Sequence, residues 1–217
     1  MLGGGYDPDN LLARDAVAAM RIRIPLAQRL HHTPDGTRMH LSRPRPPFDR
    51  EVPPMSLERT TRELSVFADY NVFFLLAADA APPGPKTGWV DEVITHMIAA
   101  RPGVVCIGTA RRMDVPVTIG IQDRPPTEDF ERWDQVTEAS ITTRGGLRIV
   151  GGSDTPAGAP ELAVPAGRYR VRVHTGGFDT LSPDGLDGED RYHLVLWPAV
   201  HEPPRVIKRY PGTLPGG

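Results

Sequence analysis

From Leu64 onward, the hydrophobic and polar positions are patterned as in short β-strands separated by turns. The segment 64–76 is rich in aromatic and β-branched residues, and it predicts a strand pair or one bent strand. The glycines at 145 and 146 are typical of a two-residue hairpin turn between two strands. Alternating or continuous apolar runs predict further strands at 104–110, 115–121, 133–143, 147–150, 161–164, 167–173 and 192–197.

One segment has helical periodicity instead. Apolar residues stand at positions 89, 90, 93, 94, 97 and 98, which is a stripe along one face of a helix. We therefore expect a helix over 89–100, with Thr87 able to cap its start and Arg101-Pro102-Gly103 ending it.

Turns recur about every 8–12 residues between these strands, which is typical of sandwiches. The predicted fold class is therefore mainly β: a β-sandwich of about seven to eight short antiparallel strands with one amphipathic helix. No repeat at the periods of solenoids or propellers occurs.

Three regions are expected along the chain. Residues 1–54 contain the run Ser42–Phe48, which cannot form regular structure, and they read as a disordered extension. Because Met55 stands just before the first strong strand signal, it is an alternative start of the protein. Residues 55–200 form the predicted sandwich domain. Residues 201–217 form a Pro/Gly-rich tail, in which Val206 and Ile207 allow an edge strand.

Composition narrows the possible functions. The 217 residues include 22 glycines and 24 prolines, which argues against a helical bundle. The net charge of −2 gives no general reason to expect direct binding to nucleic acid or to a membrane surface. No apolar run is long enough to span a membrane and no secretory signal is evident, so we expect a cytoplasmic protein. The preference for arginine over lysine suggests a GC-rich bacterial genome.

Residues that often carry chemistry occur here in structural settings. The single cysteine, Cys106, lies in an apolar run and is expected to pack in the core. The histidines show no metal-binding spacing, and His96, His174, His193 and His201 are interpreted as structural or solvated. Neither a nucleophile elbow nor a phosphate-binding glycine loop is present. We therefore expect no catalytic residue, no cofactor and no metal, and we predict that the protein is not an enzyme.

The densest polar feature is the segment 179–190, DTLSPDGLDGED. It is interpreted as a solvated turn or a set of local backbone caps, as a calcium site, or as an acidic face that meets a basic partner. Under the third interpretation its carboxylates would imitate a phosphate backbone and accelerate association electrostatically. The candidate partner-binding residues are Asp179, Asp184, Asp187, Glu189 and Asp190.

A series of landmarks in order resembles the competence protein J (ComJ) family, whose studied member inhibits a DNA-entry nuclease. The landmarks are Glu63-Leu64-Ser65-Val66, Trp89-Val90-Asp91-Glu92-Val93, Val104–Thr109 with Arg111, Val115–Ile121, Gly146-Leu147-Arg148-Ile149, Leu162–Tyr169, and Asp190 with Tyr192–Trp197. The resemblance covers about 64–198. This chain departs from the family by inserting 154–160 and by its longer, more acidic loop.

The resemblance implies a non-catalytic protein-binding domain that binds and inhibits a nuclease, in connection with competence or DNA uptake. It supplies no residue-level binding motif. The alternative is a β-sandwich sensor module that binds a small ligand or calcium. The sequence leaves open the identity of the protein partner and the oligomeric state.

Overall fold

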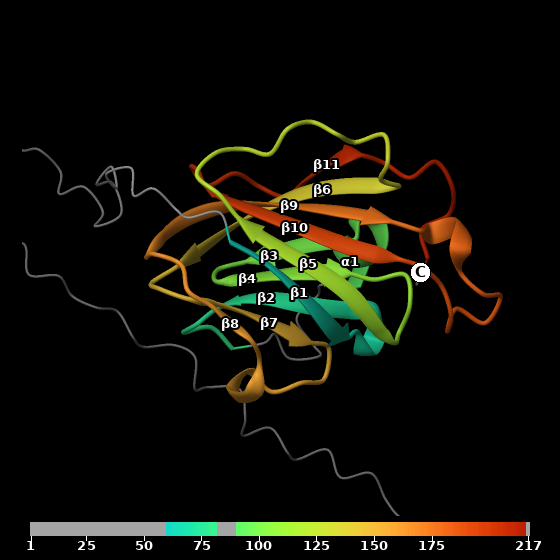
Figure 1. Cartoon of the computed structure of the whole chain (residues 1–217), viewed down its shortest axis with the longest axis horizontal. Helices are drawn as coiled ribbons and strands as arrows, with labels where there is room; N and C mark the ends of the chain where they lie inside the picture. Colours follow the sequence, from blue (N-terminus) through green and yellow to red (C-terminus); the bar gives the residue numbers. More distant parts are fainter. Residues whose placement is uncertain (1–59, 82–89, 216–217) are drawn as a thin grey trace, which may run out of the picture. The chain divides into compact units, whose positions relative to one another are not determined.

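The structure is a computed structural model, and it describes residues 60–81 and 90–215. Eleven strands in these residues form two sheets, and a single α-helix accompanies them (Figure 1). The mainly β sandwich predicted from the sequence is confirmed. The prediction of seven to eight strands was too low, because short edge strands escape a pattern search.

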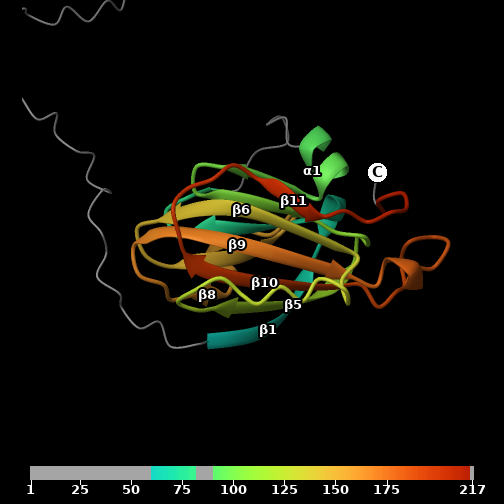
Figure 2. The ribbon, with the colours of Figure 1, turned by 90° about the horizontal axis from the view of Figure 1, so that it is seen from above.

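The larger sheet has six strands in the order β1-β5-β10-β9-β6-β11, visible in Figure 2. All neighbours are antiparallel except β5 and β10, which pair in parallel. Its strands are β1 (Thr60–Phe67), β5 (Asp114–Ile121), β10 (Arg191–Pro198), β9 (Gly167–Gly176), β6 (Gln135–Thr143) and β11 (Arg205–Lys208).

The smaller sheet has five antiparallel strands in the order β3-β4-β2-β7-β8. They are β3 (Ile98–Arg101), β4 (Val104–Gly108), β2 (Val72–Ala77), β7 (Leu147–Gly151) and β8 (Glu161–Leu162).

The main core lies between the two sheets. Alternate residues of β9 and β10, such as Val171 and Leu194, face alternate residues of the smaller sheet, such as Phe73 and Ile107, and all four are fully buried. Burial of these apolar side chains is the dominant stabilising contribution to such a fold. The core therefore holds the two sheets in place against each other, and the loops at the ends of the strands are attached to this rigid sandwich.

The chain crosses between the sheets at two places where the sequence suggested simpler connections. The segment 64–76 is neither a strand pair nor one bent strand, since β1 and β2 belong to different sheets and a 3-10 turn at Asp69–Asn71 separates them. The predicted hairpin at Gly145 and Gly146 is wrong as well. The two glycines have positive φ, but they carry the chain from β6 in one sheet to β7 in the other.

The predicted helix is shorter than its apolar stripe. Helix α1 spans Val90–His96, and Met97 then adopts a φ of 56°, which ends the helix and starts β3. The apolar spacing of 97 and 98 fits a turn into a buried strand as well as a helical face. Helix α1 packs on the outer face of the smaller sheet through Val93, at a point where Gly108 of β4 leaves room for it.

The run Pro165–Tyr169 forms a fixed turn into β9. The Tyr169 hydroxyl donates a hydrogen bond of 2.9 Å to the carbonyl of Pro165, four residues earlier. This contact resembles the tyrosine corner of other sandwiches. Within the C-terminal segment, β11 is the edge strand that Val206 and Ile207 allowed. The predicted extension 1–54, the alternative start at Met55 and the Thr87 cap lie outside the described residues.

The outer face of the larger sheet holds a buried charge network that the sequence analysis missed. Glu138 is fully buried and accepts hydrogen bonds from Arg170, Arg172 and Arg205 at 2.7–3.1 Å. These arginines lower the pKa of Glu138 against the opposing effect of burial. The network ties β6, β9 and β11 together, so its role is structural.

Candidate functional site

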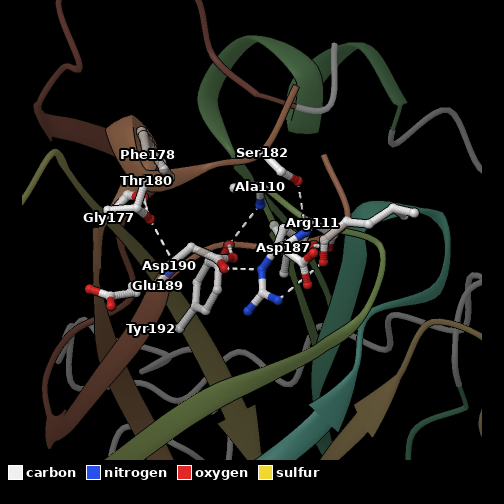
Figure 3. Close-up of polar contacts among 12 residues, drawn as sticks. Ala110, Arg111, Gly177, Phe178, Thr180, Ser182, Asp187, Glu189, Asp190 and Tyr192 are labelled. Carbon is white, nitrogen blue, oxygen red and sulfur yellow. Dashed lines mark hydrogen bonds and ion pairs between the residues drawn. The ribbon is translucent and has the colours of Figure 1, made fainter. Parts of the chain in front are cut away.

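The acidic segment predicted from the sequence lies in the connection between β9 and β10, which we call the β9–β10 loop (residues 177–190). A 3-10 turn at Phe178–Thr180 begins it, and Asp190 ends it directly before β10. Figure 3 shows the polar contacts that hold this loop. Most of these contacts are internal to the loop or made with the β4–β5 connection (residues 109–113), and the others are made with Asp134, Tyr192 and Tyr210.

Asp190 anchors the end of the loop from a fully buried position. Its carboxylate accepts a hydrogen bond of 2.8 Å from the Tyr192 hydroxyl and forms an ion pair with Nε of Arg111. The Tyr192 hydroxyl accepts a hydrogen bond of 2.6 Å from the backbone N–H of Ala110 (Figure 3). We call Asp190, Arg111 and Tyr192 the latch, because they join the loop to the β4–β5 connection.

Electrostatics in the latch favours a protonated Tyr192. Burial and the negative charge of Asp190 raise the pKa of Tyr192 well above its ordinary value, so Tyr192 keeps its proton and remains a donor. A buried carboxylate is expensive unless it is paired and hydrogen-bonded. Arg111 supplies the opposite charge, and its own side chain is only 11% exposed.

The base of the loop is closed by backbone geometry. Gly177 has a φ of 90°, and a Cβ atom at this position would overlap the carbonyl oxygen of Glu189. The Thr180 hydroxyl donates to the Gly177 carbonyl at 2.6 Å and accepts from the Glu189 N–H at 2.8 Å. Phe178 is buried beside Met97, so the loop is also fixed by apolar packing.

The tip of the loop is ordered by Ser182 and Asp184. The Asp184 carboxylate accepts bonds from the Ser182 hydroxyl at 2.5 Å and from the Leu186 N–H at 3.1 Å. The Ser182 hydroxyl accepts a bond of 2.9 Å from the N–H of Asp187. The hydrogen bonds to Asp184 lower the pKa of its carboxyl group, so it stays charged. The tip is therefore a formed turn that carries negative charge.

The structure separates the five predicted partner-binding residues into two groups. Asp179, Asp184, Asp187 and Glu189 are exposed, whereas Asp190 is buried in the latch and cannot touch a partner in this conformation. Asp179 accepts a hydrogen bond of 2.6 Å from the hydroxyl of Tyr210 in the C-terminal segment. Asp184, Asp187 and Glu189 extend into solvent, and partner contact by these residues remains a prediction.

Sequence reasoning missed Arg111 and Tyr192 as determinants of this loop. One signal was present: Asp190 and Tyr192 are two residues apart next to a strand, so both can project to the same side. Arg111 is separated from Asp190 by 79 residues, and a single sequence contains nothing that joins them.

The structure shows the surroundings of the cysteine and of several histidines. Cys106 is buried in the second apolar cluster, and burial raises the pKa of its thiol to about 12, which fits core packing. The His174 ring packs at a tilt against the rings of Trp133 and His193, and burial lowers its pKa to about 4. His201 is exposed. These histidines are thus placed as structural or solvated groups.

Within residues 60–81 and 90–215, no group of three or more His, Cys, Asp or Glu side chains is arranged to hold a metal ion. The part of the chain that the structure describes contains no helix with the length and apolar character needed to cross a membrane.

The fold and the loop together define a sandwich domain that displays an ordered acidic loop. No protein-family model and no curated protein matches the chain. Among solved structures, it is similar to ComJ from Bacillus subtilis, an inhibitor of the DNA degrading activity of NucA, at 19% identity and a TM-score of 0.45, covering 64% of this chain and 96% of that one.

The chain is also similar to the protein of Crocagin biosynthetic gene J, again at 19% identity, with a TM-score of 0.47 and coverage of 66% of this chain and 100% of the other. The likeness to both structures is one of fold. The family that the sequence landmarks resemble is thus represented among the structural neighbours.

Proposed function

We propose that this chain is a non-catalytic protein-binding domain that binds and inhibits a nuclease through the β9–β10 loop. In this proposal Asp179, Asp184, Asp187 and Glu189 face the partner, while Asp190 orders the loop from within. In this proposal the setting is a bacterial cytoplasm, and the connection with DNA uptake is what the resemblance of the sequence landmarks to the ComJ family implies.

The observation that carries the proposal is the order of the loop before any partner is bound. The latch fixes one end, Gly177 closes the base and the Ser182–Asp184 turn shapes the tip. A preformed loop loses little conformational entropy on binding, and this favours affinity. A merely solvated acidic turn would not need a buried carboxylate, a buried tyrosine and an arginine to hold it.

A nuclease is the class of partner that suits the exposed charges. Its substrate groove has to attract phosphates, and it is therefore lined with cations or metal ions. Carboxylates spaced along a loop present negative charge to that groove without a cleavable bond. Opposite charges also steer the two proteins together and raise the association rate, most strongly at low salt.

The test is a pull-down with the full chain from the lysate of its own cells at low salt, followed by elution at high salt. The eluate is assayed for degradation of plasmid DNA and identified by mass spectrometry. The proposal predicts a DNA-degrading protein as the main salt-sensitive partner, and it predicts that adding the chain back suppresses the degradation.

The native chain is compared with a variant that carries Asp184→Asn, Asp187→Asn and Glu189→Gln. It removes three negative charges, and the amide oxygen introduced by Asp184→Asn can still accept the bonds that shape the tip. We expect this variant to capture much less nuclease at low salt. Equal capture by the variant, or an eluate without nuclease activity, would contradict the proposal.

A further inference from the structure

Exposed apolar side chains gather at the end of the sandwich that carries the β9–β10 loop. Six large hydrophobic side chains are exposed in the described residues. Two of them, Ile94 and Val200, lie on α1 and after β10. The other four lie on or directly beside three connections that meet at one end, on the right of Figure 1: Phe67, Tyr70, Met113 and Leu186.

Hydrogen bonds join these three connections to one another. The β1–β2 turn (residues 68–71) receives a bond from the Thr109 N–H to the Asn71 carbonyl, and its Ala68 N–H donates to the Met113 carbonyl. The β4–β5 connection (109–113) in turn donates from Arg111 to the carbonyl of Leu186 at 3.3 Å. The three connections that carry the four apolar side chains are therefore tied together at this end of the domain.

Tyr70 is the most exposed of the four, at 73%, and its backbone is in an unfavourable conformation. Tyr70 and Asn71 both have a φ of 57°, which is rare for residues other than glycine. The fold enforces this left-handed backbone, because the side-chain amide of Asn71 donates hydrogen bonds to the carbonyls of Thr109 and Ala110. Gly152 also packs against the turn. A glycine at position 70 would adopt this backbone more easily, and an exposed tyrosine adds little to stability.

We call Phe67, Tyr70, Met113 and Leu186 the apolar patch. The charged residues around this patch indicate which kind of partner it binds. Asp69 and Asp114 flank it, Asp184 and Asp187 stand on the neighbouring loop, and the positive charge of Arg111 is neutralised by Asp190. Arg112 is an exposed cation beside them. An acidic rim of this kind repels phosphates and so disfavours nucleic acid or an anionic membrane. It suits a protein surface on which an apolar pocket is surrounded by lysine and arginine.

We propose that Tyr70 is the apolar anchor of the partner interface, inserting into a basic-rimmed pocket of the protein that the β9–β10 loop engages, with Phe67 and Met113 beside it. This inference rests on the proposed function and adds the specificity-determining residue. Rigid tyrosines surrounded by a polar rim are the residues that most often dominate binding energy at interfaces. The acidic loop governs the rate of encounter, and Tyr70 governs the lifetime of the complex.

The test compares the full chain with Tyr70→Gly for binding to the captured nuclease, by surface plasmon resonance at several salt concentrations. Glycine relieves the left-handed backbone, so the variant should melt at an equal or higher temperature. We expect its dissociation rate to rise at least about tenfold, with the salt dependence of association unchanged. Val200→Gly, which removes an equally exposed side chain elsewhere, is the control and should bind like the native chain.

The outcomes distinguish a failure of the Tyr70 anchor from a failure of the proposed function. Native binding by Tyr70→Gly, with a nuclease that the full chain still inhibits, would overturn the anchor and leave the proposed function in place. A full chain that captures no nuclease would overturn both. A full chain that forms a dimer lost in Tyr70→Gly would assign the patch to self-association instead.

Discussion

At the scale of single residues, Asp190 shows how an acidic residue can serve the shape of a loop and not its surface. Its carboxylate joins Arg111 and Tyr192, and through Tyr192 it reaches the backbone of Ala110. The sequence showed a cluster of acidic residues of equal appearance. Only the fold reveals that Asp190 is the acidic residue that faces inward, because its ion-pair partner Arg111 is distant in the sequence.

The variant Tyr192→Phe tests the latch. It leaves the N–H of Ala110 and one oxygen of Asp190 without their hydrogen-bond partner in a buried place. We expect a loss of about 1–3 kcal/mol in the free energy of unfolding, measured by urea denaturation. Tyr210→Phe, which removes an exposed hydroxyl bonded to Asp179, should cost clearly less. Equal losses in the two variants would contradict a special role for the latch.

Glu138 is the second buried carboxylate with a structural role. Glu138→Gln would leave Arg172 buried without this counter-charge and Arg170 with only the more distant carboxylate of Glu202, at 4.0 Å. We therefore expect a loss of about 3–5 kcal/mol in thermal or urea unfolding. Arg205 is the exposed member of the same network, with 57% of its side chain accessible. Arg205→Gln should therefore cost no more than about 1 kcal/mol. A mild effect of Glu138→Gln would show that the network contributes little.

His174 makes stability depend on pH. Burial lowers its folded-state pKa to about 4, against 6.5 for an unperturbed histidine, despite the nearby carboxylate of Asp129. Its contribution is complete above pH 6.5 and is lost as the pH falls toward 4, because only the unfolded chain takes up the proton in that range. His174→Gln should therefore flatten the decline in unfolding free energy between pH 6.5 and 4.5, by on the order of 2 kcal/mol. An unchanged slope, equal to that of His201→Gln, would contradict this account.

At the scale of elements, the β9–β10 loop owes its order to Gly177 as well as to its acidic residues. Gly177→Ala would require a side chain at a φ of 90° and would push Cβ into the Glu189 carbonyl. We expect it to destabilise the loop by more than about 1 kcal/mol and to raise hydrogen exchange at the amides of 178–189. Gly185→Ala is the control, because its φ is also positive but its Cβ would meet no atom within 4 Å. Equal exchange in both variants would mean that Gly177 does not close the loop.

The strands also show what sequence patterns can predict and what they cannot: they predict which residues face the core, but not which sheet a strand joins. The alternation in 115–121 and 167–173 determines which residues face the core, and the structure confirms it there. The stripe through 97 and 98 and the pair Gly145–Gly146 misled, because local spacing does not record the sheet to which a strand belongs. The partners of β1 and β2 are chosen by contacts between distant segments, and those contacts leave no periodic signal.

At the scale of the whole domain, hydrogen bonds join three connections at one end of the sandwich. The core fixes both sheets, the latch fixes the β9–β10 loop to the β4–β5 connection, and the β1–β2 turn completes the same end. The fold class and the acidic loop could be predicted from the sequence. The apolar residues beside the loop could not, since Phe67 and Tyr70 precede it by more than a hundred residues.

Inhibition of a nuclease through the β9–β10 loop is tested most directly by titrating the captured nuclease with the full chain and measuring plasmid DNA degradation at low and at physiological salt. We expect complete inhibition by the native chain, and weaker inhibition as salt rises, because surface charges are screened within about 8–10 Å. The variant with Asp184→Asn, Asp187→Asn and Glu189→Gln should need at least about tenfold more protein for half-inhibition, while its melting temperature stays native. Equal inhibition by the native chain and this variant at every salt concentration would contradict the claim that the acidic loop is the contact.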